Sequence, residues 1–495
     1  MKTLFRVDAS PDVGSGHLVR CLTLAQELKR SGASCRFVGR ELPAHLAASV
    51  REQGHDLQSL GPVARGGAPE TVWPLQEQLA DAKAVVATNA DNAWDWLVVD
   101  HYGLGVDWEQ AARPAARRLL AIDDLGRPHG CDALLDANAQ PEAPQYGALQ
   151  ERGTPCLLGP RYALLKPEFL AARAGVTPRS GPVRRVLVFM GGMDSVNATE
   201  PVLQAIALVD KSLAVDVVIG PLHPARGRIE ALAESWPSLH CLVQTGDMAR
   251  LCAEADLAIG AGGGASWERC ALGLPTLALG LAENQSVVLE RAARRGLVAA
   301  PAGLGLDSQA IALHLRALLA DAPRRNQMSR SAMEAVDARG AARVASFMRY
   351  AGISVRPARA DDSAALLAWR NQPEIRSASR DPAEIGRADH ERWLAGVLAS
   401  SQRKLLIGEL DGLPVGVVRF DIDGDSAEVS IYRVQAPAAA GAGPSLLRAA
   451  EAWLREQQPG LRLLRAEVLR DNLPSHQLFL DGGYARDSTR YLKEL

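Results

Sequence analysis

The sequence predicts an α/β protein in which two consecutive parallel-sheet domains precede a smaller α+β domain. The chain has 495 residues, and because one domain typically holds about 100 to 200 residues, it is expected to form roughly three. Up to residue 350, short apolar runs alternate with amphipathic helical segments, which is the pattern of a parallel sheet. From Ile353 onward this alternation ends, so the last domain is predicted to be α+β.

The first domain is expected over residues 1–175. Its apolar runs are bounded by polar residues, and a helical segment at 18–30 follows the first of them. A stretch at 174–185 with two prolines and two glycines is expected to link this domain to the next. The expected strands are 3–7, 35–39, 96–100 and 119–124.

The same pattern restarts in the second domain, which is expected over residues 183–350. In an open parallel sheet, ligands bind beyond the carboxyl ends of the strands, where loops and helix N-termini converge. The functional residues are therefore expected in the loops that follow the strands. The expected strands are 186–192, 215–220, 256–264 and 276–281, and the expected helices are 199–210, one from Ser266, 284–295 and 322–350.

Composition excludes several classes of partner. With 47% hydrophobic residues and a formal net charge of −2, the chain has no global bias toward nucleic acid or an anionic membrane. It contains no run of about 18 uncharged apolar residues and no signal-peptide pattern at its N-terminus, so a cytoplasmic protein is expected. The seven cysteines form no C-x-x-C pair and are expected to be reduced, packed thiols.

A glycine loop follows the first predicted strand. Gly14 and Gly16 allow the backbone to turn tightly and approach a ligand, and the next helix offers unpaired N–H groups and a partial positive charge to an anion. A dinucleotide fingerprint requires a third glycine where this chain has Val19, so NAD binding is disfavoured. His17 stands at the first turn of the helix, where a histidine either caps and packs or takes part in catalysis.

A second glycine loop follows a strand of the second domain and leads into a helix with Ser266 and Glu268 in its first turns. Consecutive glycines expose backbone N–H groups suited to a pyrophosphate. Asn284 and Gln285 follow the next strand, again at a helix start, and offer neutral donors and acceptors. The three glycines are Gly262, Gly263 and Gly264.

Together these motifs resemble a known enzyme family. The segment G262-GGASWERCALGLP with E283-NQ is similar to the nucleotide-sugar signature of GT-B proteins related to the peptidoglycan GlcNAc transferase. Within that superfamily, residues 1–350 resemble the UDP-sugar hydrolases of pseudaminic acid biosynthesis. The other segments that carry this resemblance are R6-VDAS, G14-SGHLVRC, V99-DHYGL, I122-DDLGRPHGCDALLDAN, G159-PRYALLKPEF and G191-GMDSVNAT.

The resemblance implies a GT-B-like pair of Rossmann-type domains and a metal-independent hydrolysis of UDP-2,4-diacetamido-2,4,6-trideoxy-β-L-altrose to UDP and the free sugar. His17 is then expected to orient or deprotonate the attacking water, because an unperturbed imidazole has a pKa near neutrality. The second glycine loop and its helix are expected to hold the pyrophosphate, while Glu268 accepts hydrogen bonds from a sugar diol.

Several polar residues at the expected strand ends have two interpretations. Asp8 and Asp100 end strands that face the expected cleft, and His101 and Tyr102 follow at once. These residues either orient His17 or bind the sugar, or else they cap helices and anchor loops.

Two further pairs of polar residues also have more than one interpretation. Asp123 and Asp124 are adjacent carboxylates, but neighbouring strand residues point to opposite faces and make a poor chelate, so capping or sugar contact is favoured and no metal is predicted. Asn197 and Thr199 are expected near the cleft, where both binding and helix capping fit.

The segment 353–495 resembles a GNAT N-acetyltransferase. W369-RNQPEIR is similar to the openings of amino-sugar and ribosomal-protein acetyltransferases, and N472-LPSHQLFLDGGY is similar to their closing motif. The expected strands are 353–358, 404–410, 414–421, 427–434 and 463–469, and the expected helices are 361–371, 389–398 and 445–456.

The GNAT resemblance implies acetyl-CoA as cosubstrate, held by backbone donors before a helix. Two residues depart from the family pattern: Ala438 stands where Gln or Arg is expected, and Phe479 replaces the tyrosine that commonly protonates the leaving thiolate. His476, Tyr484 and Glu428 remain as acid or base candidates, each with a structural interpretation beside the catalytic one. The residues expected to bind acetyl-CoA are Val434, Gly441, Gly443, Asn472 and Ser475.

The sequence thus predicts a bifunctional enzyme: a UDP-sugar hydrolase whose C-terminal domain acetylates the 4-amino group of the precursor UDP-sugar. Two alternatives stay open. One is a GT-B glycosyltransferase acting on a related UDP-sugar, and the other is a GNAT domain that binds without catalysis. Metal, nucleic acid and membrane are not expected as partners.

Overall fold

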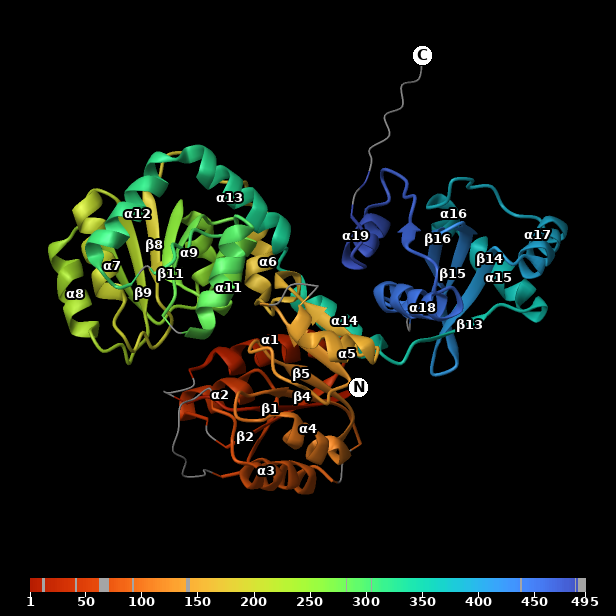
Figure 1. Cartoon of the computed structure of the whole chain (residues 1–495), viewed down its shortest axis with the longest axis horizontal. Coiled ribbons are helices and arrows are strands. Elements are labelled where there is room, and N and C mark those ends of the chain that lie inside the picture. Colours follow the sequence, from red (N-terminus) through yellow and green to blue (C-terminus); the bar gives the residue numbers. More distant parts are fainter. Residues whose placement is uncertain are drawn as a thin grey trace, which may run out of the picture. The chain divides into compact units, whose positions relative to one another are not determined.

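The computed structural model describes residues 1–10, 14–40, 42–61, 71–90, 93–138, 143–281, 283–303, 305–436, 439–485 and 487, without the side chains of residues 283 and 284. The chain divides into two compact units, Met1–Ala345 and Ser346–Leu495 (Figure 1). The first unit contains two parallel sheets, and the second contains a mixed sheet. Within the described ranges, no helix is both long enough and apolar enough to cross a membrane.

The first sheet has the strand order β3-β2-β1-β4-β5-β6-β7 among the described residues, and its neighbouring strands pair in parallel. The order reverses between β1 and β4, where Val7 lies beside Asp100. The strands are β1 (Lys2–Val7), β2 (Ser34–Gly39), β3 (Asp56–Ser59), β4 (Trp94–Asp100), β5 (Ala116–Ile122), β6 (Ala133–Asp136) and β7 (Cys156–Leu158).

Helices connect these strands. The helix predicted at 18–30 is α1 (Gly16–Arg30), so His17 lies in its first turn. Leu18, Leu22 and Ala25 form part of its buried stripe, and basic residues in its last turn complement the partial negative charge of the helix end. The other helices of this region are α2 (Ala44–Glu52), α3 (Leu75–Thr88), α4 (Val106–Ala112), α5 (Gly147–Glu151) and α6 (Pro167–Arg173).

The second sheet, also parallel, has the order β10-β9-β8-β11-β12 in the described part of the chain and reverses between β8 and β11. Its strands are β8 (Arg185–Phe189), β9 (Ala214–Ile219), β10 (Leu239–Val243), β11 (Leu257–Ala261) and β12 (Thr276–Leu279). The helices are α7 (Thr199–Val209), α8 (Arg226–Ser235), α9 (Met248–Glu254), α10 (Gly264–Ala271), α11 (Glu283–Arg294), α12 (Ser308–Ala320), α13 (Ala322–Ala335) and α14 (Gly340–Tyr350).

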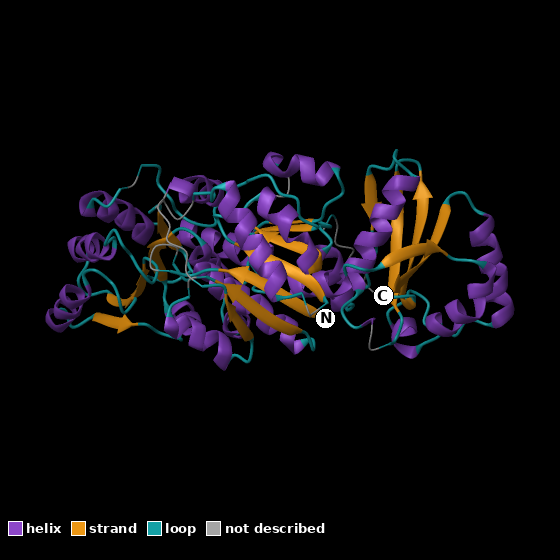
Figure 2. Ribbon diagram, turned by 90° about the horizontal axis from the view of Figure 1, so that it is seen from below, coloured by secondary structure: helices purple, strands orange, loops and turns teal. Residues whose placement is uncertain are grey.

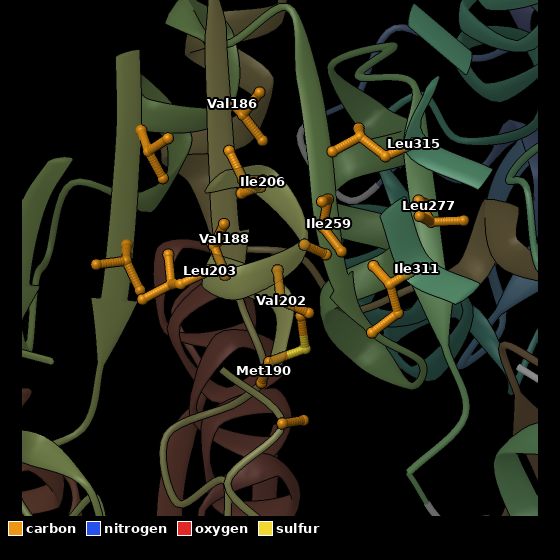
Figure 3. Close-up of a cluster of buried hydrophobic side chains, with 14 of the residues drawn as sticks. Val186, Val188, Met190, Val202, Leu203, Ile206, Ile259, Leu277, Ile311 and Leu315 are labelled. Carbon is orange, nitrogen blue, oxygen red and sulfur yellow. The ribbon is translucent and has the colours of Figure 1, made fainter. Parts of the chain in front are cut away.

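Alternate residues of the second sheet pack against opposite helix layers. Val186 and Val188 of β8 point into a cluster with Leu203 of α7 and Ile311 of α12 (Figure 3), whereas Leu187 packs on the other face with residues of α9, α10 and α13. Successive side chains of a strand point to opposite faces, and both faces are covered here, which accounts for the apolar run from Val186 to Phe189. The buried strands give the loops at their ends a rigid support.

The single helix predicted over 322–350 is wrong. The structure has α13 and α14 instead, separated where Ala338 adopts a φ of +60°, a left-handed conformation that interrupts a helix. A Cβ atom at Gly340 would lie 2.2 Å from the carbonyl oxygen of Ala163, so the start of α14 approaches that backbone too closely for a larger residue. Helix α12 was not predicted at all.

Arginine side chains anchor the segment predicted as a linker. Arg179 donates to the carbonyl oxygens of Leu272, Cys252 and Ala253, at or beside the ends of α10 and α9. The last carbonyl groups of a helix carry partial negative charge, so a cation stabilises them. The segment is therefore held against the helices of the second sheet.

The C-terminal unit is a mixed sheet with the order β13-β14-β15-β16-β17 within the described residues, antiparallel except for the last pair. Helices lie on both sides of this sheet (Figure 2). Its elements are β13 (Ser354–Pro357), α15 (Ser363–Arg370), α16 (Pro373–Ser377), α17 (Arg387–Ala399), β14 (Arg403–Leu410), β15 (Leu413–Asp423), β16 (Ser426–Arg433), α18 (Gly443–Gln457), β17 (Leu463–Arg465) and α19 (Leu473–Asp481).

Strand β17 is shorter than the strand predicted at 463–469. It pairs with β16 only from Leu463 to Arg465, whereas β16 continues to Arg433. The two strands therefore share a short ladder, and the second half of β16 runs toward the loop before α18 without β17 beside it.

Candidate functional site

Most of the predicted site residues of the first unit lie at the two places where strand order reverses. In the first sheet, the loop after β1 carries Asp8 and Gly14, while Asp100 ends β4 and residues 101 and 102 follow it. In the second sheet, the loops after β8 and β11 carry Asn197 and the glycines 262–264. Neighbouring loops diverge at such a reversal and leave a crevice for a ligand.

His17 is paired with Asp100. The Nδ1 atom of His17 lies 2.5 Å from Oδ1 of Asp100, and the histidine is 6% exposed. An ionised carboxylate only accepts hydrogen bonds, so the proton of this contact belongs to Nδ1, and Nε2 of the neutral ring keeps its lone pair. Among the described residues Nε2 has no hydrogen-bond partner. The ring can therefore accept a proton from a bound water.

Arg20 holds Asp100 from the other side. Its Nε lies 2.5 Å from Oδ2 and its Nη2 2.6 Å from Oδ1, a bidentate contact. Burial alone would raise the pKa of Asp100, but the charge of Arg20 and the hydrogen bonds from Arg20 and His17 outweigh burial and hold that pKa well below its usual value. Asp100 is thus ionised and orients His17 without competing for its proton.

Tyr102 and Asp8 have different surroundings. The Tyr102 ring packs edge-on against His17, with 4.5 Å between ring centroids. Asp8 is 5% exposed, accepts a hydrogen bond from the backbone N–H of Arg40 at 2.6 Å and lies 3.2 Å from Nε2 of His101. These contacts favour sugar or histidine contact for Tyr102 and loop anchoring for Asp8 and His101.

The first glycine loop leaves room beside α1. Gly14 has a φ of +79° and donates its N–H to the carbonyl oxygen of Ser10 at 2.8 Å. A Cβ atom placed at Gly14 or Gly16 would meet no other atom of the described residues within 4 Å. The glycines therefore leave space at the start of the helix that carries His17.

Asp123 and Asp124 face different partners. Asp123 accepts a hydrogen bond from the backbone N–H of Arg127 and lies 3.4 Å from Nε2 of His129, whereas Asp124 lies 3.4 Å from Nη1 of Arg20. The described residues contain no group of three or more side chains that could hold a metal ion. Asp123 thus anchors its own loop, and Asp124 belongs to the cluster around Arg20.

His129 gives the first unit a pH-dependent stability. Burial lowers the pKa of His129, but its contacts with the carboxylates of Asp123 and Glu109 outweigh burial and raise the pKa to about 9. A raised folded-state pKa stabilises the fold fully below about pH 6.5, and this contribution, on the order of 3 kcal/mol, is lost as the pH rises through 9. The difference in melting temperature between wild type and His129→Gln should therefore shrink from pH 6 to 9.5. A pH-independent difference would contradict this assignment.

The second glycine loop turns directly into α10. Gly263 has a φ of +91° and precedes Gly264, the first residue of the helix. The N–H of Gly262 donates to the carbonyl oxygen of Leu279 at 3.0 Å. Among the described residues, a Cβ atom at Gly263 or Gly264 would meet no other atom within 4 Å, so these residues leave the start of α10 open to an anion.

The loop after β12 reaches the same place. The side-chain oxygen of Gln285, on α11, accepts a hydrogen bond from the N–H of Leu281 at 3.1 Å. A Cβ atom at Gly262 would also lie 3.1 Å from that oxygen. The structure thus brings Gln285 and Gly262 together, as two residues of one site would require. The side chain of Asn284 lies outside the described residues.

Three successive residues of α10 have separate surroundings. Ser266 is buried, and its hydroxyl lies 3.4 Å from the carbonyl oxygen of Ala261, so it supports the loop from inside. Trp267 donates its Nε1–H to Oδ1 of Asn138 at 2.8 Å, a direct bond between the two halves of the first unit. Glu268 is partly buried, and burial raises its pKa.

The loop after β8 bonds largely to itself. Asp194 accepts hydrogen bonds from the hydroxyl and the N–H of Thr199, at 2.6 and 2.9 Å, and lies 3.0 Å from Nε2 of His223. Asn197 adopts a φ of +54° and donates to Glu200, while its own side-chain oxygen is buried and has no partner among the residues described. Thr199 therefore belongs to the cap of α7, and Asn197 keeps one acceptor unused.

In the C-terminal unit, three side chains hold the carbonyl groups of the loop before α18. The C=O and N–H of a peptide point in opposite directions, so this arrangement turns the N–H groups of Ala440 and Gly441 away from those side chains. Gly441 has a φ of +91°, and Gly443 begins α18. Ala438 lies outside the described residues. The three side chains that donate hydrogen bonds to carbonyl oxygens of this loop are Arg433 to Ala439 (2.9 Å), Tyr350 to Ala440 and Ser346 to Gly441 (3.0 Å).

Two of the residues expected to bind acetyl-CoA have structural contacts. Val434 is buried, and its N–H donates to the carbonyl oxygen of Val415 at 3.1 Å. The side chain of Asn472 caps α19 by accepting the N–H of Ser475 at 3.1 Å. Asn472 is thus a helix cap, and Ser475 stands in the first turn of that helix.

The acid and base candidates of the C-terminal unit also have partners. Tyr484 donates its hydroxyl to Glu451 at 2.8 Å, burial raises its pKa, and its ring packs on Phe479 with 5.0 Å between centroids. His476 Nε2 lies 3.1 Å from a backbone carbonyl oxygen, and Glu428 lies 3.4 Å from an arginine. These contacts favour a structural interpretation for Tyr484, which has both a hydrogen bond and a ring contact.

Sequence reasoning missed Arg20, Asn138 and Arg269. Arg20 follows His17 by three residues, so helical spacing places both on one face of α1, and this signal could have indicated it. Asn138 and its partner Trp267 are 129 residues apart, and such a contact has no local signal.

Comparison with known proteins agrees with this architecture. Residues 353–484 match the family model of the acetyltransferase (GNAT) domain. The N-terminal part aligns with the UDP-2,4-diacetamido-2,4,6-trideoxy-beta-L-altropyranose hydrolase of Campylobacter jejuni at 24% identity over 257 residues, 52% of this chain and 83% of that protein. The chain joins a relative of this hydrolase to a GNAT domain. We refer to its two parts as the hydrolase-related unit and the GNAT domain.

Further relatives match the hydrolase-related unit. The spore coat polysaccharide biosynthesis protein SpsG of Bacillus subtilis is 30% identical over 215 residues, 41% of this chain and 62% of that protein. The crystal structure of Acinetobacter baumannii MurG superposes with a TM-score of 0.48 and 15% identity, over 70% of this chain and 99% of MurG. Since that superposition is loose, the assignment of a GT-B-like pair of Rossmann-type domains rests on the strand orders of the two parallel sheets.

Proposed function

We propose that the hydrolase-related unit cleaves UDP-2,4-diacetamido-2,4,6-trideoxy-β-L-altrose to UDP and the free sugar, and that the GNAT domain acetylates the 4-amino group of the precursor UDP-sugar. The observation that carries the hydrolase proposal is the His17–Asp100 pair at the strand reversal, in a segment homologous to such a hydrolase. The pair supplies a base whose accepting nitrogen has no partner among the described residues.

The chemistry follows from the roles of these groups. Nε2 of His17 takes a proton from water as the water oxygen attacks the anomeric carbon, and the bond from that carbon to the diphosphate oxygen breaks. Asp100 stabilises the imidazolium that forms. The charge that develops on the departing UDP is balanced by the N–H groups of the 262–264 loop and the start of α10.

For the GNAT domain, the loop held by Arg433, Tyr350 and Ser346 is the proposed site of the acetyl-CoA pyrophosphate. The acceptor amine attacks the thioester carbonyl and gives up a proton, the carbon–sulfur bond breaks, and the CoA thiolate leaves and takes up a proton. The acetylated product is the substrate proposed for the hydrolase-related unit, so joining the two parts raises the local concentration of this intermediate.

The decisive experiment measures UDP and free sugar released by the purified full-length chain from this UDP-sugar, without acceptor and with EDTA present. Equimolar release that EDTA does not change supports metal-independent hydrolysis. Release that requires an added acceptor would make the unit a glycosyltransferase, and loss of release with EDTA would show a metal requirement.

A glycine substitution tests the acetyl-CoA site. Gly441→Ala places a side chain at a φ of +91°, where an L-residue is strained by about 1 kcal/mol or more, and displaces the loop. Acetyl-CoA affinity, measured by calorimetry, is expected to fall roughly 10-fold. Gly424→Ala is the matched control, because Gly424 also has a positive φ, of 60°, but lies in the turn between β15 and β16. Equal affinities for both variants would place the acetyl-CoA site elsewhere.

A further inference from the structure

Arg269 is a buried cation without an anionic partner. The residue is 2% exposed, and its Nη2 donates to the carbonyl oxygen of Ala261 at 2.7 Å and to the hydroxyl of Ser266 at 3.1 Å. Its Nε and Nη1 atoms are buried and have no hydrogen-bond partner in the part of the chain that the structure describes. Among the described residues, no carboxylate forms an ion pair with it. Buried charges in proteins are normally paired, so this guanidinium lacks a counter-charge.

Two other buried arginines of the hydrolase-related unit are compensated. Arg6 is fully buried and contacts two carboxylates, Asp8 and Asp81, each at 2.9 Å. Arg325 is 3% exposed and donates to three backbone carbonyl oxygens between 2.6 and 3.0 Å. Arg269 has neither arrangement, and burial lowers its pKa.

The guanidinium lies at the strand reversal of the second sheet. A Cβ atom at Gly260 would lie 2.6 Å from Nη1 of Arg269 and 3.0 Å from the carbonyl oxygen of Phe189. Gly260 of β11 and Phe189 of β8 are paired neighbours at the ends of these strands. The charge therefore sits directly beneath the glycine loop that begins with Gly262.

We propose that Arg269 is a phosphate-selectivity residue of the hydrolase-related unit, a buried positive charge whose counter-charge is the diphosphate of a bound nucleotide. It acts through space and through its bonds to Ala261 and Ser266, which support the loop. This inference rests on the proposed function, because it assumes that the loop binds UDP. Without a bound nucleotide, the charge of Arg269 is unbalanced. Arg269 therefore strengthens UDP binding but destabilises the unliganded protein.

The test compares Arg269→Met, Arg269→Lys and Arg325→Met in the full-length chain. UDP and uridine affinities are measured by calorimetry, and melting temperatures are measured without ligand. Arg269→Met is expected to bind UDP roughly 10-fold to 100-fold more weakly, to bind uridine as wild type does, and to melt at the same or a higher temperature. Arg269→Lys should retain part of the UDP affinity, because it keeps the charge. Arg325→Met should melt lower and bind UDP normally, because its partners are structural.

The outcomes separate this inference from the proposed function. If wild type binds UDP and Arg269→Met binds it equally well, the inference fails and the function stands. If Arg269→Met and Arg269→Lys melt lower and lose UDP affinity to the same extent, Arg269 is a structural brace and the inference also fails. If wild type binds no UDP, the proposed function and the inference fail together.

Discussion

Replacing His17 with alanine is expected to lower UDP release from the UDP-sugar roughly 10²-fold to 10⁴-fold, the usual contribution of a general base. The physical reason is the position of the imidazole: Asp100 holds Nδ1 at 2.5 Å, so the variant loses the only group of this pair that can accept a proton. Release is measured under single-turnover conditions with excess protein, so that a change in substrate binding is separated from a change in the chemical step.

The matched control is His45→Ala. His45 is exposed on α2, a helix that connects strands of the same sheet. Its replacement therefore removes one histidine from this region without affecting the His17–Asp100 pair. Both variants should melt close to wild type. Near-normal release by a folded His17→Ala would return His17 to a packing role at the start of α1.

Replacing Asp100 with asparagine is expected to lower the same rate roughly 10²-fold to 10⁴-fold while the substrate affinity changes little. The asparagine amide can donate to Nδ1 of His17, which moves the ring proton to Nε2 and removes the accepting nitrogen. The loss of the carboxylate also removes the charge that stabilises the imidazolium and leaves Arg20 without its bidentate partner.

Asp95→Asn is the control for this substitution, because Asp95 belongs to the same strand, β4, but bonds to the backbone N–H of Lys2 at the other end of the sheet. A variant with unchanged kcat would show that Asp100 only anchors α1.

Much of the fold could be predicted from local patterns. The strands predicted at 3–7, 186–192 and 276–281 are short, mostly apolar runs, and the bounds of each lie within three residues of those of a strand in the structure. Hydrophobic periodicity and turn residues act over a few positions, so they are visible in the sequence. The break between α13 and α14 could not be predicted from the sequence, because Ala338 has no intrinsic preference for the left-handed conformation that it adopts.

The candidate site likewise has local features that the sequence reveals and contacts that only the fold determines. The sequence by itself determined that glycine loops open two helices, that His17 stands at one of them and that Glu268 stands at the other, because these features depend on neighbouring residues alone. Only the tertiary structure decided which acid serves His17. Asp100 and Asp8 both end parallel strands at the same reversal, yet Asp100 contacts the imidazole and Asp8 is taken up by the loop around Arg40.

The same holds for the charge of Arg269. Its sequence neighbours do not reveal whether a carboxylate lies beside it, because potential partners are distributed over segments brought together only by the packing of β8, β11 and α10. Pairing of buried charges depends on distances of a few ångströms between residues that are remote in the sequence. Burial strengthens the attraction within a pair and raises the cost of an unpaired charge. The residue types and their local order were therefore present in the sequence, whereas their partners and their electrostatic balance were set by the fold.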